Sequence, residues 1–195
     1  MTGSTVYSVV LGPISAEYKI LKDGEPVYET WFAANELEFR PPGEDDPVLE
    51  LKAPTAFDFL SGMEYRLTDL ETDEIVGDIS EEAVLIGRRW TIKSADGEKR
   101  GIIRMKGKKG ALMHEIAALR FFTGPMQMEI VDGTERRVGT IDRTVGVHDR
   151  ITVSVDDDAD FDPRLAMAAA ILFDAADRRK NRHGRGIARS LGGRK

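Results

Sequence analysis

The chain is poor in the residues on which much enzyme chemistry depends. Its 195 residues include no cysteine and only three histidines, and none of His114, His148 and His183 lies at metal-ligand spacing from another. The lack of thiols excludes disulfides and cysteine catalysis and favours a cytoplasmic location. The sequence contains no Walker loop, nucleophile elbow or dinucleotide fingerprint. We therefore expect a non-enzymatic protein that needs no cofactor and no metal.

Long hydrophobic runs are missing as well. Residues 1–8 lack the charged and apolar regions of a signal peptide. The apolar passage at residues 165–176 is interrupted by Asp174, and as a helix it covers about 18 Å. A hydrocarbon core of about 30 Å requires about 20 apolar residues. We expect no transmembrane segment, and a cytoplasmic protein that can attach peripherally to a membrane.

Basic residues are concentrated at the C-terminal end of the chain. The net charge is −6, yet the sequence from Arg178 onward holds eight basic residues and no acidic one. The remainder holds 20 basic and 34 acidic residues, a net charge of −14. Residues 181–195 also lack apolar mass and are rich in glycine, which predicts a disordered basic tail after a single domain at residues 1–180.

One strongly helical passage has no polar face. Asp162 is a suitable N-cap, Pro163 suits the first turn and Arg178 favours the C-terminal end, which predicts a helix at about residues 163–180. Its apolar side chains are spread around the whole helical wheel, so we expect protein to enclose the helix. These side chains are Leu165, Met167, Ile171, Leu172 and Phe173.

Most of the remaining sequence has the pattern of β-hairpins. Alternating apolar residues flank Asp-Gly pairs at Asp23, Asp96 and Asp132, and a longer turn follows at residues 71–74. Val76-Gly-Asp-Ile79 and Val138-Gly-Thr-Ile141 each close a hairpin, and their glycines lie on the face of the following isoleucine. Such a glycine marks a close approach of the alanine-rich helix or a simple bulge. The pattern predicts a mainly β fold, an antiparallel sheet closed around the helix.

These segments, taken in order, resemble a known family. The hairpin ending in Val76-Gly-Asp-Ile79, the stretch Trp90-Thr-Ile-Lys-Ser-Ala-Asp-Gly97 and the passage at residues 161–174 look like the LURP-one-related proteins. That family is grouped with phospholipid scramblases and tubby C-terminal domains. The resemblance covers residues 6–180 and implies a closed barrel of about twelve strands around a C-terminal helix. Tubby domains bind phosphoinositides, whereas the palmitoylated cysteine cluster of typical scramblases has no counterpart here.

A basic turn is the strongest candidate for a binding site. Lys106, Lys108 and Lys109 lie in the sequence Met105-Lys-Gly-Lys-Lys-Gly110, ahead of a short helix predicted at about residues 112–122. The Gly-Lys-Lys-Gly motif imitates the loop with which KH domains clamp a nucleic-acid backbone. A KH loop, however, joins two helices, and residues 90–103 have the pattern of a hairpin. We expect the three lysines to bind phosphate, in a lipid headgroup or in a nucleic acid.

An acidic turn resembles part of a calcium site. Asp156, Asp158 and Asp160 have the spacing of the first three ligands of an EF-hand loop. Phe161 stands where the loop needs glycine, and Met167 stands where it needs glutamate. A solvated acidic turn is therefore the favoured interpretation, with loose calcium binding as the alternative.

Three functions follow from these observations. The first is a tubby-like barrel that binds phospholipid headgroups or another anionic ligand through Lys106, Lys108 and Lys109. The second is a structural or protein-interaction barrel without a ligand. The third is a nucleic-acid-associated protein that uses the basic turn and the tail.

Overall fold

The chain folds into twelve β-strands and a C-terminal helix. The computed structural model describes residues 3–11, 17–33, 36–53, 64–83, 88–106, 126–144 and 150–175. The strands are β1 (Ser4–Leu11), β2 (Glu17–Lys22), β3 (Glu25–Ala33), β4 (Glu36–Arg40), β5 (Leu49–Lys52), β6 (Glu64–Asp69), β7 (Glu74–Ala83), β8 (Arg88–Ser94), β9 (Lys99–Met105), β10 (Met126–Asp132), β11 (Arg137–Thr144) and β12 (Arg150–Asp156).

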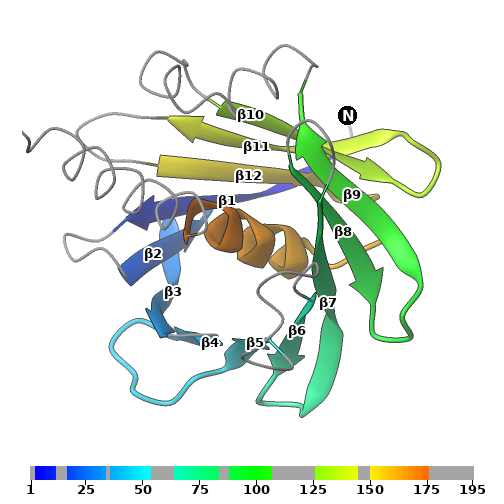
Figure 1. Cartoon of the computed structure of the whole chain (residues 1–195). Coiled ribbons are helices and arrows are strands. Elements are labelled where there is room, and N and C mark those ends of the chain that lie inside the picture. The colour runs from blue at the N-terminus through cyan, green and yellow to red at the C-terminus, as the bar shows by residue number, and fades with distance from the viewer. Residues whose placement is uncertain are drawn as a thin grey trace, which may run out of the picture.

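The strands close into one antiparallel barrel. Each strand pairs with its neighbours in sequence, and β1 closes the ring by pairing with both β2 and β12. Closure leaves none of these strands with an unpaired edge. Figure 1 shows the helix, in orange, inside the ring of strands. The predicted mainly β fold, a closed twelve-stranded antiparallel barrel around a C-terminal helix, is confirmed.

The tight turns gather at one end of the barrel. The turns after β2, β6, β8 and β10 contain residues with positive φ angles, such as Asp23 (φ 53°) and Gly97 (φ 81°), as hairpins of this kind require. These turns, the loop after β4 and the connection from β12 to the helix all lie at what we call the turn end. At the opposite end, which we call the rim end, β1 terminates at Leu11 and β12 begins at Arg150.

The central helix runs from the turn end to the rim end. It is helical over residues 163–175, and residues 165–174 are all buried. At its start Asp162 accepts a hydrogen bond from the Arg164 amide at 2.8 Å, as an N-cap residue does. The predicted enclosure of an all-round apolar helix is therefore correct, and residues 176–180 of the predicted helix lie outside the described residues.

The two glycines of the hairpin motif have different neighbours. A Cβ atom on Gly77 would lie 2.9 Å from Leu165 Cδ1 of the helix and 2.4 Å from the Lys93 carbonyl oxygen. A Cβ atom on Gly139 would instead lie 2.4 Å from the Ser154 carbonyl oxygen. Register shifts accompany both positions. Both glycines thus allow a neighbouring strand to approach closely, and Gly77 also allows the helix to approach, through a leucine rather than an alanine.

A charged helix residue ties each end of the helix to the barrel wall. At the turn end, Arg164 contacts Asp162 and Asp69 of β6, with N–O distances of 2.8 Å to each. At the rim end, the Tyr18 hydroxyl of β2 donates a hydrogen bond of 3.0 Å to Asp174. Arg143 of β11 forms an ion pair of 3.1 Å with the same carboxylate. These contacts fix how far the helix extends through the barrel.

Candidate functional site

Lys106 directly follows β9 at the rim end of the barrel. Its side chain is exposed, and its backbone amide donates a hydrogen bond of 3.0 Å to the carbonyl oxygen of Gln127, near the start of β10. The other two lysines of the predicted site, Lys108 and Lys109, and the helix predicted after them lie outside the described residues. The structure therefore places one of the three predicted site residues.

Lys106 belongs to a larger group of basic residues, which we call the basic rim. The rim-end termini of the five consecutive strands β8 to β12, together with Lys106 directly after β9, carry six basic residues. No acidic residue lies within the last two positions of any of these five strands at this end. The members are Arg88, Arg89, Arg104, Lys106, Arg143 and Arg150.

Three members of the basic rim already have acidic partners. Arg89 lies 3.3 Å from Glu82, and Arg104 forms ion pairs of 2.7 and 2.9 Å with Glu129 and Glu135. The hydrogen bond to Glu129 is the main cause of the raised pKa of Arg104. Arg143 is the partner of Asp174 inside the barrel.

Lys106 and Arg150 differ from these three. Both side chains are exposed, and neither forms an ion pair with any residue that the structure describes. Residue parity places both on the outer face, since Ile103 and Ile151 of the same strands belong to the core. Two strands separate β9 from β12, so the two side chains begin about 14 Å apart. Among the described residues, they are the members of the basic rim that we consider as candidates to bind an anion.

Sequence reasoning missed most of the basic rim. Arg104 and Lys106 belong to the basic stretch around the predicted turn, but Arg89 precedes it and Arg150 follows it by more than 40 residues. What brings them together is the pairing order of β8 to β12. The sequence does hold one signal. Each of these residues lies at or next to the start or end of a strand, and successive strands of an antiparallel sheet bring such positions to the same end of the barrel.

The aspartate-rich segment before the helix, residues 156–160, forms ion pairs instead of a cation-binding site. Asp158 lies 2.9 Å from Arg136, and Asp160 lies 2.7 Å from Arg100. Asp157 accepts a hydrogen bond of 3.1 Å from the Thr5 hydroxyl. Asp156, Asp158 and Asp160 do not form a convergent set of ligand atoms in the described part of the chain.

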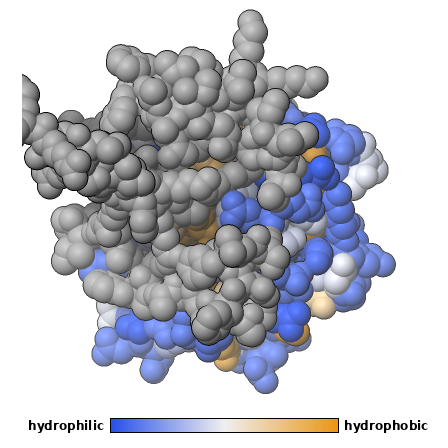
Figure 2. Space-filling model, viewed as in Figure 1, coloured by the Kyte–Doolittle hydropathy of each residue, from blue (hydrophilic) through white to orange (hydrophobic). Residues whose placement is uncertain are grey.

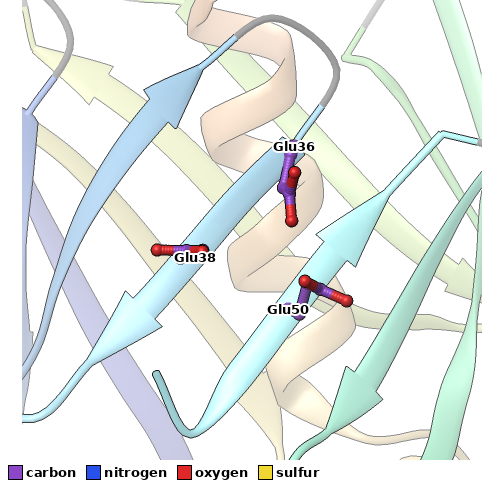
Figure 3. Close-up of side chains that lie close together, drawn as sticks. All are labelled: Glu36, Glu38 and Glu50. Carbon is purple, nitrogen blue, oxygen red and sulfur yellow. The ribbon is translucent and has the colours of Figure 1, made fainter. Parts of the chain in front are cut away.

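A different carboxylate group does converge, on the outside of β4 and β5. Glu36, Glu38 and Glu50 offer oxygens within 4.8 Å of one another (Figure 3). The Lys52 ammonium, however, lies 2.6 Å from Glu50 and 3.1 Å from Glu36. Hydrogen bonds to Glu50 and Glu36 raise the pKa of Lys52. The lysine thus supplies the positive charge that a metal ion would otherwise bring.

The described surface is largely polar. On the face shown in Figure 2 it is mainly hydrophilic, with small hydrophobic areas. The exposed large apolar side chains among the described residues are Leu70 and Ile75, beside the turn between β6 and β7. No helix within the described ranges is long and apolar enough to cross a bilayer.

The fold is similar to a solved plant structure. A crystal structure of an Arabidopsis thaliana protein of the LURP-one-related family matches with a TM-score of 0.52 and 12% sequence identity. The match covers 88% of this chain and 91% of the plant chain. No protein-family model and no curated protein matches the sequence. At this identity the likeness concerns the barrel fold.

Proposed function

We propose that this protein is a non-enzymatic barrel that binds phospholipid headgroups, and thereby attaches peripherally to anionic membranes. Lys106, Lys108 and Lys109 would contact phosphate together with Arg150. The observation that carries the proposal is the basic rim, in which Lys106 and Arg150 are exposed and form no ion pair with any described residue. The resemblance of the sequence to the family that includes tubby domains, which bind phosphoinositides, adds support to the proposal.

The expected strength follows from the charges. A lysine or arginine near an anionic surface contributes about 1 kcal/mol, and salt screens this contribution over about 8 Å at physiological ionic strength. The three lysines together would therefore contribute about 3 kcal/mol, roughly a hundredfold in affinity. The eight basic residues from Arg178 onward would add to this attraction.

The proposal is tested by vesicle sedimentation with a matched pair of variants on one strand. Lys106→Glu reverses a charge in the basic rim, whereas Lys99→Glu makes the same change at the turn end of β9. Both lysines are exposed, and neither has an ion pair among the described residues. We expect Lys106→Glu to weaken binding to phosphatidylserine vesicles roughly thirtyfold, because it removes an attraction and adds a repulsion. Lys99→Glu should have a much smaller effect.

The controls distinguish lipid from other anions. Pure phosphatidylcholine vesicles should not bind, and duplex DNA at the same salt concentration should bind more weakly than the anionic vesicles. Stronger binding to DNA would replace the proposed function with a nucleic-acid-associated one. Absence of binding to both would leave a structural or protein-interaction barrel.

A further inference from the structure

The turn end of the barrel is strongly acidic. The segments at this end, residues 22–25, 41–48, 70–74, 95–100, 132–137 and 156–160, contain 16 acidic and five basic residues. Eight exposed acidic side chains in the first three segments form no ion pair with any described residue. We call these eight the acidic turns, and they are Asp23, Glu25, Glu44, Asp45, Asp46, Glu71, Asp73 and Glu74.

Two of the five basic residues at the turn end are paired, whereas Lys22, Lys99 and Arg137 form no ion pair with any described residue. Arg100 lies 3.1 Å from Glu98 and 2.7 Å from Asp160, and Arg136 lies 3.2 Å from Asp132. An anionic surface that approached the turn end would therefore meet the eight side chains of the acidic turns and only three basic side chains without a described partner. We therefore expect the negative charges of the acidic turns to repel the phosphate groups of an anionic membrane.

The rim end is far less acidic than the turn end, although its described strand termini also include Glu17, Glu36, Glu64, Glu81 and Glu82. It carries the basic rim, and the central helix brings the chain there before the basic tail begins at Arg178. The helix dipole places about half a negative charge at the same end. Lys106 and Arg150, which are exposed and form no ion pair with any described residue, outweigh that half charge.

From this polarity we propose that the barrel meets an anionic membrane end-on. The basic rim faces the lipid headgroups, the barrel axis stands roughly along the membrane normal, and the acidic turns point into water. This orientation rests on the proposed function, because it describes how the same basic rim engages its ligand.

The dimensions of the barrel favour end-on over side-on binding. A seven-residue strand such as β9 spans about 24 Å, and the usual strand tilt leaves about 18 Å along the barrel axis. The screening length is about 8 Å at physiological salt. End-on docking therefore keeps the acidic turns beyond the range of the membrane field, whereas side-on docking brings the turn end and the basic rim to the surface together.

The absence of cysteine allows a direct test with single fluorescent labels. Thr144→Cys places a label at the rim end of β11, and Ala95→Cys places one in the turn after β8. Both positions are exposed, and both lie on the wall formed by β8 to β12. With phosphatidylserine vesicles that contain a headgroup-attached quencher, we expect strong quenching at position 144 and almost none at position 95.

The outcomes separate this inference from the proposed function. Vesicle binding with equal quenching at both positions would overturn the end-on orientation and leave lipid binding intact. Absence of vesicle binding by the unlabelled wild-type protein would overturn the proposed function and the orientation with it. If the label at position 144 itself prevents binding, Gln127→Cys supplies a second exposed position at the rim end, on β10.

A charge variant gives an independent measurement. Replacing Asp45 and Asp46 with asparagine removes two charges from the acidic turns. End-on docking predicts less than about a twofold change in affinity, because these charges lie beyond the screening length. An increase of roughly tenfold or more would instead indicate that the turn end lies at the membrane surface and would overturn the orientation.

Discussion

The two ends of the central helix are held by ion pairs in different surroundings. At the turn end, the side chains of Arg164, Asp162 and Asp69 are 28%, 30% and 17% exposed. At the rim end, those of Arg143 and Asp174 are 12% and 2% exposed. Water can replace lost partners at the first end but much less readily at the second.

The difference in exposure indicates which of the two ion-paired contacts determines the position of the helix in the barrel. A partly exposed ion pair contributes little net stability, because its members are also well solvated in the unfolded chain. A buried pair is costly to form, yet removing one member leaves an uncompensated charge in an apolar interior. We infer that the Arg143–Asp174 pair sets the position of the helix and that the Arg164 contacts reinforce it.

Between its two ion-paired ends, the helix is apolar and buried. A substitution in this apolar part should have the largest effect on stability. Leu172 is buried within the barrel. Leu172→Ala should cost about 2–5 kcal/mol through lost burial and a cavity. Leu172→Asp would bury an unpaired charge and should prevent folding to a soluble monomer. Size-exclusion chromatography and thermal melting measure both, and unchanged melting of the aspartate variant would contradict an enclosed helix.

The next effect concerns the buried anchor itself. Asp174→Ala removes a buried acidic partner of Arg143 and should cost about 3–5 kcal/mol in denaturant unfolding. Tyr18→Phe removes only one hydrogen bond to Asp174 and should cost about 1–2 kcal/mol. The double variant Asp174→Leu with Arg143→Leu should recover much of the loss, since no charge is left buried. A double variant as unstable as Asp174→Ala would show that the charge was not the cause.

A smaller effect concerns a neutral group at the turn end. Burial, followed by the nearby Tyr28 and Asp162, raises the pKa of Tyr7 to about 12 from an ordinary value of 10.0. Because the folded state has the higher pKa, this contribution is complete below about pH 10 and is lost as pH rises toward 12. The loss amounts to about 2–3 kcal/mol. Comparison of alkaline unfolding in wild type and Tyr7→Phe measures it, and identical alkaline midpoints would contradict the shift.

The sequence predicts the barrel and its helix better than it predicts the candidate site. Hairpin turns at Asp23, Asp96 and Asp132 are local features, and so is the apolar surround of residues 165–173. These features can be predicted because turn geometry and hydrophobic periodicity depend on residues that are close together in the sequence. They were sufficient to predict a closed sheet around an enclosed helix.

The site depends on relations that no local pattern contains. Arg89 and Arg150 belong to one rim only because five strands pair in order. Asp174 reads in the sequence as an interruption of an apolar run, and its partner Arg143 lies 31 residues earlier. Register decides such pairings, and a shift of one residue would place Arg143 on the outer face.

The smallest expected effect on stability concerns Arg164, at the more exposed end of the helix. Arg164→Ala should cost only about 1–2 kcal/mol, because water can reach the remaining carboxylates of Asp162 and Asp69. The hydrogen bond from Arg164 is the main cause of the lowered pKa of Asp69. A lowered folded-state pKa stabilises the protein above the unfolded value of about 4, and this contribution is lost as pH falls through the folded value.

The difference between wild type and Arg164→Ala in urea unfolding should therefore be constant near neutral pH and shrink below about pH 4. Arg164→Lys, which keeps the charge but cannot reproduce the paired hydrogen bonds, should fall between the two. A cost as large as that of Asp174→Ala, or a difference that persists unchanged in acid, would mean that the two ends anchor the helix equally. Solvent exposure would then not be what distinguishes them.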